Sequence, residues 1–263
     1  MDLKLNGKRV LVMASSKGLG KAIATEFARE GAAVFLTSRS EESLSKGAAD
    51  IKAETGNDAI HYAPCDMSSG DDIIRLFSEV RRTMGDPDIL INNTGGPRAG
   101  GFDDVTDEDW VHAFGQNLLS YTRTIREALP SMRKNNWGRI VNISSSSTKE
   151  VIDNLILSNT MRAGMVGLSK TLARETAGSN ILVNTVGPGR IETDRIIELD
   201  SVTAKKRGMP IGDITEEQQS RIPMGRYGQP AEFACAVVFL ASGANTYLTG
   251  QSLVIDGGML KAL

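Results

Sequence analysis

Residues 14–20 read Ala14-Ser15-Ser16-Lys17-Gly18-Leu19-Gly20, and the interpretation of the whole chain starts from this glycine-rich stretch. It follows the β-like run 9–13 and precedes apolar residues with the spacing of one helix face: Leu19, Ala22, Ile23 and Phe27. Glycines in such a turn let the backbone approach a pyrophosphate, which then rests on the positive N-terminus of the helix. A glycine-rich turn between strand and helix can also be only a turn, so the rest of the chain must distinguish the two interpretations.

Short apolar runs alternate with helical patterns along the rest of the chain. The β-like runs after 9–13 are 33–37, 59–63, 89–91, 139–143, 181–186 and 252–255. Long helices are predicted at 107–133, 155–178 and 230–242. Repeated strand–helix units imply a parallel sheet with helices on both faces. The sequence therefore predicts an α/β fold with seven strands, in one domain that spans residues 1–263.

Residues 192–225 are the one long stretch without a core pattern, and they are rich in charged residues. The stretch begins beyond the strand predicted at 181–186. Because a long segment at such a position is more often functional than disordered, we expect it to be a substrate lid.

Composition excludes several classes of protein. Thirty basic and 32 acidic residues give a net charge of -2, and no basic block stands out, so nucleic acid is not an expected partner. No apolar run reaches about 18 residues, so no membrane span is expected, and the first residues lack the apolar region of a secretory signal. Cys65 and Cys235 match no metal spacing. We expect two reduced thiols in a cytoplasmic protein without a metal site.

Polar and glycine residues follow several of the predicted strands. Asn92-Asn93-Thr94-Gly95 follows the fourth strand, where open parallel sheets bind ligands. Asp66 follows the third strand, Gly187-Pro188-Gly189 the sixth and Asp256-Gly257-Gly258 the seventh. These positions favour a dinucleotide site over a simple turn at residues 14–20.

These segments make the sequence similar to the short-chain dehydrogenase/reductase family over nearly its whole length. The matching segments are 14–20, 92–95, 143–145, 172–173, 188–189 with Thr193, 249–251 and 256–258. The resemblance implies a single Rossmann-like domain with a doubly wound parallel sheet, similar to 3-oxoacyl-(acyl-carrier-protein) reductases. It also implies an oxidoreductase that acts on a small-molecule substrate and assembles as a homotetramer or homodimer.

The resemblance assigns a set of cofactor-binding positions, with one departure at the glycine-rich turn. The family's Thr-Gly opening is Met13-Ala14 here, and alanine can serve if the backbone does not need a positive φ. The assigned residues are Ser15, Ser16, Lys17, Gly18, Leu19, Gly20, Ser38, Arg39, Asp66, Met67, Asn93, Thr94, Gly95, Arg162, Pro188, Gly189, Ile191 and Thr193.

The charge after the second strand indicates which nicotinamide cofactor is used. Enzymes that bind the unphosphorylated form place a carboxylate about 20 residues after the glycines. Here the strand ends in Thr37-Ser38-Arg39-Ser40, and the first acid is Glu41. The Arg39 guanidinium suits a 2′-phosphate, and Lys17 adds a second cation, so the prediction is NADP(H). The alternative is that both are solvated surface charges.

The catalytic positions depart from the family pattern. Family members carry a Ser after the fifth strand, a Tyr 13 residues later, a Lys four residues after the Tyr, and an Asn on the preceding helix. In this chain Asn117 and Ser145 match, but counting forward from Ser145 and backward from Leu172-Ala173 places Ser158 and Arg162 at the Tyr and Lys positions. A serine hydroxyl is far less acidic than a phenol of pKa about 10, and arginine does not shuttle protons. The sequence therefore predicts a non-standard catalytic set of Asn117, Ser145, Ser158 and Arg162.

Other polar residues are weaker candidates. Tyr121 lies one helix turn after Asn117 and could approach the site, but a core or interface role is favoured. His61 and His112 have no paired carboxylate and are interpreted as structural. Glu150, Lys149 and Arg98 lie in loops, where surface roles are expected.

Three functions remain open from the sequence. The first is an NADP(H)-dependent oxidoreductase of a small or medium carbonyl or alcohol. The second is a protein that binds NADPH or a metabolite without turnover. The third is non-redox chemistry, as in halohydrin dehalogenases, which also carry Arg at the Lys position. Those relatives retain the Tyr and lose the cofactor turn, whereas this chain keeps the turn and lacks the Tyr. The third function therefore ranks last. The first function is favoured over the second.

Overall fold

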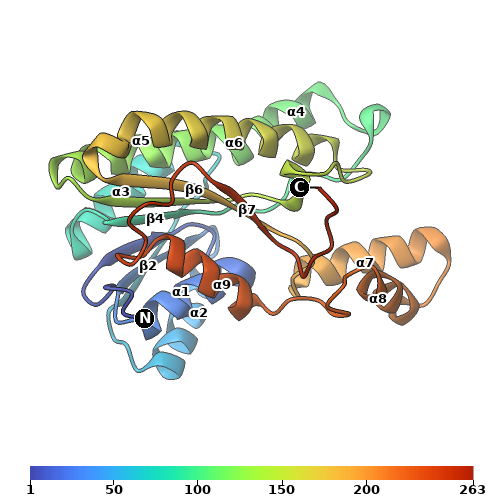
Figure 1. Cartoon of the computed structure of the whole chain (residues 1–263), viewed down its shortest axis with the longest axis horizontal. Helices are drawn as coiled ribbons and strands as arrows, with labels where there is room; N and C mark the ends of the chain where they lie inside the picture. The colour runs from blue at the N-terminus through green and yellow to red at the C-terminus, as the bar shows by residue number, and fades with distance from the viewer. Residues whose placement is uncertain (263) are drawn as a thin grey trace.

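The computed structural model describes residues 1–262 and contains the predicted seven-stranded sheet (Figure 1). The strands are β1 (Arg9–Val12), β2 (Ala33–Ser38), β3 (Ile60–Pro64), β4 (Ile89–Asn92), β5 (Gly138–Ile143), β6 (Ile181–Pro188) and β7 (Ser252–Ile255). All neighbouring strands pair in parallel, in the order β3-β2-β1-β4-β5-β6-β7. Each predicted β-like run is confirmed, with boundaries that differ by at most two residues.

Helices cover both faces of the sheet, as predicted. One face carries α1 (Gly18–Arg29), α2 (Glu41–Thr55) and α9 (Pro230–Leu240), and the other carries α3 (Gly70–Met84), α5 (Ser120–Lys134) and α6 (Ile156–Thr176) (Figure 1). Two apolar cores result, with Phe27 and Phe233 buried in the first and Phe77 and Tyr121 in the second. Because both faces are covered, β1, β4, β5 and β6 are buried nearly throughout, whereas the edge strands β3 and β7 are partly exposed.

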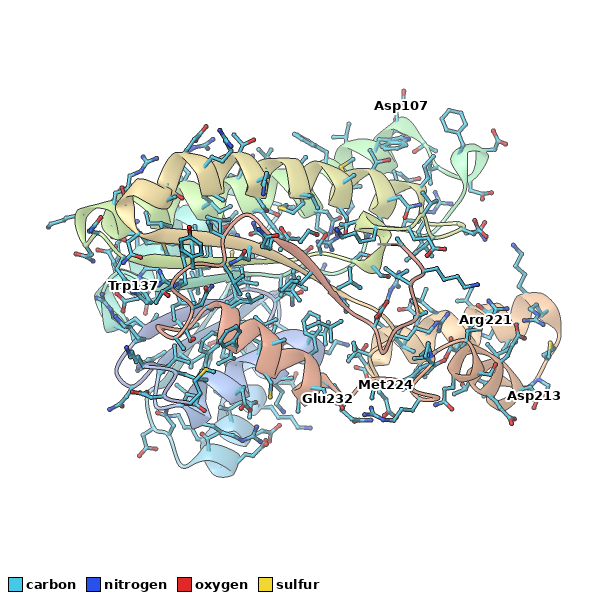
Figure 2. The ribbon with its side chains drawn as sticks, viewed as in Figure 1. Asp107, Trp137, Asp213, Arg221, Met224 and Glu232 are labelled. Carbon is cyan, nitrogen blue, oxygen red and sulfur yellow. The ribbon has the colours of Figure 1, made fainter. Side chains whose placement is uncertain are left out.

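The point where the strand order reverses lies between β1 and β4. Parallel sheets of this kind bind ligands outside the carboxyl ends of the strands at such a point. The turn at 14–20 follows β1 and residues 93–95 follow β4, so both lie there. In Figure 2, Trp137, just before β5, lies at the opposite end of the molecule from Asp107 and Asp213.

The helix predicted at 107–133 is interrupted in the structure. It consists of α4 (Asp107–Phe114), a π-helical turn η2 (Gly115–Leu119) and then α5. Single π turns inside helices are rare and often occur at functional sites. The prediction of one continuous helix rested on the average spacing of apolar residues, and this average does not reveal a single π-helical turn. The helices predicted at 155–178 and 230–242 are confirmed as α6 and α9, each slightly shorter.

The stretch 192–225 contains two helices, α7 (Asp194–Arg207) and α8 (Ile211–Ser220), which project from the carboxyl end of the sheet (Figure 1). Few of their side chains are buried, which explains why the sequence showed no core pattern: Asp200, Ala204 and Ile214. Buried Asp200 accepts hydrogen bonds from Arg190 Nη1 (2.8 Å) and from the Tyr227 hydroxyl (2.7 Å). The two helices are thus tied to the chain on both sides of the stretch.

Short 3₁₀ turns complete the fold at η1 (Phe102–Asp104), η3 (Ser146–Thr148) and η4 (Ala177–Ser179). Within residues 1–262, none of the helices combines the length and apolar character that a membrane crossing requires.

Candidate active site

The turn after β1 is closed tightly by its own backbone. Gly18 has a φ of +58°, and a Cβ added to Gly20 would lie 2.3 Å from the Ala14 carbonyl oxygen, so both positions require glycine. Ala14 itself has a φ of +47°. From the sequence, alanine was expected to serve here only if the backbone did not need a positive φ. That condition is not met. Ala14 holds a left-handed conformation that costs about 1–2 kcal/mol for a residue with a Cβ.

Ser15 fastens this turn to the neighbouring strand. Its buried hydroxyl donates to the Val12 carbonyl (2.7 Å) and accepts from the Thr37 backbone N–H (3.0 Å). The Ser15 side chain therefore holds the turn in place, while Lys17 and Gly18 are exposed at its tip and Ser16 and Leu19 are half-buried.

The N-terminus of α1 is suited to an anion. Its first turn contains no acidic residue, and its N-cap residue Lys17 makes no side-chain capping hydrogen bond. The free backbone N–H groups and the helix dipole together favour negative charge at this end. Lys17 approaches Asp194 of α7 (Nζ–Oδ2 3.3 Å), but both side chains are exposed, so this ion pair contributes little.

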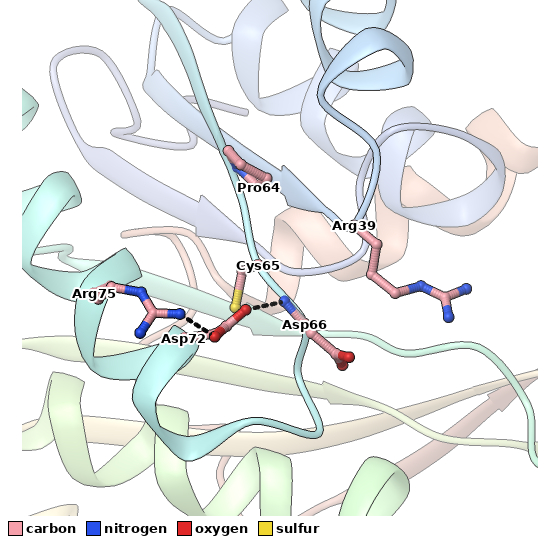
Figure 3. Close-up of a pocket in the computed structure, with 6 residues that line it drawn as sticks. All are labelled: Arg39, Pro64, Cys65, Asp66, Asp72 and Arg75. Atoms are coloured by element: carbon pink, nitrogen blue, oxygen red, sulfur yellow. Dashed lines mark hydrogen bonds and ion pairs between the residues drawn. The ribbon is translucent and has the colours of Figure 1, made fainter.

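A pocket of about 370 Å³ lies beside the ends of β2 and β3, lined by Arg39, Pro64, Cys65, Asp66, Asp72 and Arg75 (Figure 3). Arg75 is paired with Asp72, whereas Arg39 is exposed and forms no ion pair with any residue in 1–262. Asp66 Oδ1 accepts from the backbone N–H and hydroxyl of Ser68 (2.9 and 2.8 Å). Burial raises the pKa of the Cys65 thiol to about 12, so this cysteine is not a nucleophile at neutral pH.

Two further candidate residues, Ser38 and Met67, are the sequence neighbours of Arg39 and Asp66. Ser38 closes β2, and its hydroxyl donates to the Ser40 carbonyl (3.4 Å). Met67 follows Asp66 and is buried. The pocket therefore offers one unpaired guanidinium, Arg39, beside an exposed carboxylate, Asp66.

The loop after β4 connects the glycine-rich turn to Asn117. The Asn93 amide donates to the Ala14 carbonyl (3.2 Å). Buried Asn117, in the π turn, donates from Nδ2 to Thr94 Oγ1 and to the Gly95 carbonyl (both 2.8 Å). Its Oδ1 has no protein partner among residues 1–262. The π turn thus fixes the amide of Asn117 and leaves one buried acceptor available.

Ser145, Ser158 and Arg162 come from β5 and α6. Ser145 caps η3 by accepting from the Ser147 backbone N–H (3.1 Å). Ser158 is 9% exposed, and its hydroxyl has no hydrogen-bond partner in the described part of the chain. Arg162, one helix turn later and 5% exposed, donates from Nη1 to the Ile143 carbonyl (2.9 Å). No carboxylate of residues 1–262 pairs with Arg162, and its buried Nε lacks a partner.

Tyr121 has the core position that the sequence favoured, and its hydroxyl also reaches this site, which was the alternative. It is fully buried, its hydroxyl donates to the Ile143 carbonyl (3.0 Å), and Arg162 Nη1 lies 3.2 Å from the same hydroxyl. The only sequence signal was its spacing from Asn117, because the contact with Arg162 requires α5, α6 and the end of β5 to meet.

The segment after β6 returns to the glycine-rich turn. A Cβ added to Gly189 would lie 2.5 Å from Asp256 Cβ, so Pro188 and Gly189 pass closely beside the end of β7. Ile191 is buried, and Thr193 donates to its carbonyl (3.3 Å) at the start of α7. The first turn of α7 approaches the site at two residues. Asp194 forms the ion pair with Lys17, and Arg195 lies beside Gly96, where an added Cβ would be 3.6 Å from Arg195 Nη2.

The remaining candidates lie apart from this constellation. Arg98 pairs with Asp109 at the surface, in agreement with the expected surface role. Burial lowers the pKa of His61, so this histidine stays neutral at pH 7. No cluster of three metal-ligating side chains occurs in residues 1–262.

Comparison with known proteins places this geometry in context. A family model described as Enoyl-(Acyl carrier protein) reductase matches residues 13–260. The 3-oxoacyl-(acyl-carrier-protein) reductase of Aquifex aeolicus is 36% identical over 98% of this chain and 100% of its own length. L-Sorbose reductase from Gluconobacter frateurii, solved with NADPH and L-sorbose, superposes with a TM-score of 0.94 at 31% identity over 100% of both chains.

A further solved structure is that of an NADPH-bound short-chain oxidoreductase from Pseudomonas aeruginosa PAO1, described as containing an atypical catalytic center. Its TM-score to this chain is 0.87 at 25% identity, over 97% of this chain and 98% of that one.

Proposed function

The chain belongs to the short-chain dehydrogenase/reductase family, and from this premise we propose that it is an NADP(H)-dependent oxidoreductase with a non-standard catalytic set. Its substrate is a small or medium carbonyl or alcohol, as in 3-oxoacyl reductases. The observation that carries the proposal is the position of Asn117, Ser145, Ser158 and Arg162 next to a preformed dinucleotide cradle at the switch point of the sheet.

The cradle has the features that NADP(H) needs. The turn at 14–20 admits no side chain at Gly20, and the first turn of α1 is free of acids, which suits the pyrophosphate. Arg39 is an unpaired guanidinium that suits the 2′-phosphate, and Asp66 suits the adenine side of the pocket. Residues 93–95, Arg162 and residues 188–193 hold the nicotinamide half. When bound, the nicotinamide supplies the hydride.

The chain's own residues then act on the carbonyl oxygen. The Ser145 hydroxyl donates a hydrogen bond to it, and Arg162 supplies positive charge in a buried site, where charge stabilisation is strong. Ser158 is too weak an acid to replace a phenol, and Ser145 carries the same hydroxyl, so the proton comes from water or from the substrate, directly or through Ser145. The partnerless Oδ1 of Asn117 can hold such a water.

We further propose that residues 192–225 act as a substrate lid, since the first turn of α7 contacts both Lys17 and the loop at Gly96. Cytoplasmic location and assembly as a homotetramer belong to the same proposal.

A second candidate function is binding of NADPH or a metabolite without turnover. The observation that favours it is the Ser158 hydroxyl, which has no hydrogen-bond partner among residues 1–262 to activate it. The two functions differ in one measurable respect, because both predict saturable NADPH binding but only the first predicts product.

The test is a binding and turnover experiment with NADPH and NADH. Purified protein is titrated with each cofactor and then assayed on a panel of carbonyls and alcohols. Arg39→Leu is expected to weaken NADPH binding about tenfold or more, because a charge-assisted contact is lost, and to leave NADH binding unchanged. Arg75→Leu is the matched control, since this arginine lines the same pocket but is already paired with Asp72.

Absence of turnover across the panel, with NADPH binding intact, would favour the binding protein. Equal affinity for NADPH and NADH in the unmodified protein would contradict the assignment of Arg39 to the 2′-phosphate. Failure of either cofactor to bind would contradict the proposed function altogether.

A further inference from the structure

Arg162 is a buried guanidinium whose charge no carboxylate of residues 1–262 compensates. We propose that Tyr121 is a positioning residue that fixes this guanidinium, so that its remaining donors serve the ligand. The inference rests on the proposed function, in which Arg162 contacts cofactor and substrate. It starts from three atoms beneath the site: the Tyr121 hydroxyl, the Ile143 carbonyl oxygen and Arg162 Nη1.

These three groups form a closed hydrogen-bonded triangle. Arg162 Nη1 donates to the Ile143 carbonyl (2.9 Å) and to the Tyr121 hydroxyl (3.2 Å), and that hydroxyl donates to the same carbonyl (3.0 Å). A guanidinium nitrogen of this type carries two hydrogens. Nη1 therefore faces two acceptors inside the protein, and the donors that have no protein partner among residues 1–262 and are left for a ligand are Nε–H and the two hydrogens of Nη2.

The phenol matters because one contact does not orient a guanidinium. A single bond to the Ile143 carbonyl would fix the position of Nη1 but leave the plane of the group free to rotate about it. The second contact, to Tyr121, fixes that plane, and a pre-oriented fork loses less freedom for each bond it forms.

Two other arginines show the alternatives that this fold uses. Arg139, also buried, is surrounded by backbone carbonyls of Gly138, Asn180, Ser242 and Asn245. Arg190 is paired with the Asp200 carboxylate. Arg162 has neither arrangement, so within residues 1–262 its orientation depends on one carbonyl and one phenol.

The elements that meet at the triangle are those that carry the candidate catalytic residues. Tyr121 follows the π turn that holds Asn117, Ile143 lies two residues before Ser145, and Arg162 lies one turn after Ser158 on α6. The Tyr121 ring is fully buried in the apolar core beneath α5 and α6. Because packed core side chains hold single rotamers, the hydroxyl presents a fixed point to Arg162.

The test is a double-mutant cycle with NADPH binding as the readout. Tyr121→Phe keeps the ring and removes only the hydroxyl, and we expect it to raise the NADPH Kd about tenfold, the effect typical of losing a hydrogen bond to a charged group. In an Arg162→Met background the same change is expected to alter Kd less than about twofold, because residues that act through one another are not additive. A purely structural role would make the two effects add, and additivity would overturn the proposal.

Thr124→Val is the matched control. It removes another buried hydroxyl of α5, one that donates to Asn92 Oδ1 (2.6 Å) and does not contact Arg162. We expect this variant to lower the melting temperature to a similar extent while leaving the NADPH Kd unchanged. A Kd shift equal to that of Tyr121→Phe would count against the proposal.

A second measurement needs no cofactor. In ¹⁵N spectra of the unmodified free protein, the Arg162 side-chain N–H signals, assigned by their loss in Arg162→Lys, are expected to be resolved and slowly exchanging. Signals averaged by free rotation would overturn the proposal. If NADPH fails to bind, the proposed function fails, while the spectra still decide whether the Arg162 guanidinium is held in one orientation.

Discussion

Ser158 and Arg162 lie one turn apart on α6 and are nearly buried, at the positions where the sequence resemblance predicts the family's Tyr and Lys. Exchanging them for the family residues tests whether the rest of the site is intact. We expect Ser158→Tyr with Arg162→Lys to raise NADPH-dependent carbonyl reduction by about 10²-fold or more, because a general acid typically contributes that much. Initial rates of NADPH oxidation on the carbonyl panel measure the effect.

The control for this pair is Ser158→Phe with Arg162→Lys, which introduces the ring without its hydroxyl and is expected to give no gain. If the Tyr and Lys variant also shows no gain while NADPH still binds, more than these two residues has diverged. The triangle beneath Arg162 supplies one physical reason for such a result, since Tyr121 is arranged for a guanidinium and not for an ammonium.

Ala14 tests the cost of a positive φ in the glycine-rich turn. Ala14→Gly is expected to stabilise the protein by about 1 kcal/mol, since relief of the left-handed strain exceeds the entropy that glycine adds to the unfolded chain. Urea unfolding measures the change. Ala22→Gly, inside α1, is the control and is expected to destabilise by about 1 kcal/mol. A destabilised Ala14→Gly protein would show that the alanine methyl makes a compensating contact.

Single residues differ in how far the sequence predicts them. That Ser158 and Arg162 share one face of a helix could be predicted by counting, because residues four apart on a helix face the same way. The φ of Ala14 could not, since it follows from how the turn closes against Gly20. The contact between Tyr121 and Arg162 was also missed, because residues 41 positions apart meet only when α5 and α6 pack side by side.

Among the secondary-structure elements, the strands were the most predictable and α7 and α8 the least. Strands buried on both faces carry a continuous apolar signal, whereas few side chains of α7 and α8 are buried. In α7 and α8 the hydrogen bonds of buried Asp200 to Arg190 and Tyr227 serve as the anchor that an apolar core provides elsewhere. Burial and a hydrogen bond to Asp200 raise the pKa of Tyr227 to about 12, so at neutral pH the phenol is a protonated donor to that carboxylate.

This anchor gives a prediction for the proposed lid. Asp200→Ala leaves Arg190 without its buried partner, a change that costs several kcal/mol where such pairs are broken. We expect amide hydrogen exchange across 194–220 to accelerate about a hundredfold or more while the strands stay protected. Glu198→Gln, which removes an exposed ion pair of α7 with Arg195, is the control and should change exchange little. Equal acceleration in β1 and β4 would mean that Asp200 supports the whole fold instead of the lid.

The exposed apolar side chains of residues 1–262 include two separate sets. Phe102, Val111 and Phe114 lie on and beside α4, and Tyr247, Leu248 and Leu253 lie on and beside β7. A homotetramer with D2 symmetry needs at least two different interfaces, and exposed apolar sets commonly mark interfaces. The outer face of α6 adds small exposed residues that permit close helix approach: Ala163, Gly164 and Gly167.

The proposed assembly as a homotetramer leads to a prediction about the surface of α6. A Cβ added to Gly167 meets no atom of its own chain, so Gly167→Glu is tolerated by the folded subunit. Across an interface between two copies of α6, the added carboxylates would be desolvated and close to each other, which is strongly unfavourable. We expect light scattering to report a tetramer of 28.2-kDa chains for the unmodified protein and a dimer for this variant.

Gly212→Glu, at an exposed glycine of α8 that is equally free of neighbours, is the matched control and should remain a tetramer. A tetramer that survives Gly167→Glu would place the interface away from α6. An unmodified protein that runs as a monomer would leave both apolar sets in water, and their exposure would then need a different partner. The outcome also bears on the site, because α6 carries Ser158 and Arg162 on its buried face while its outer face would be held by another subunit.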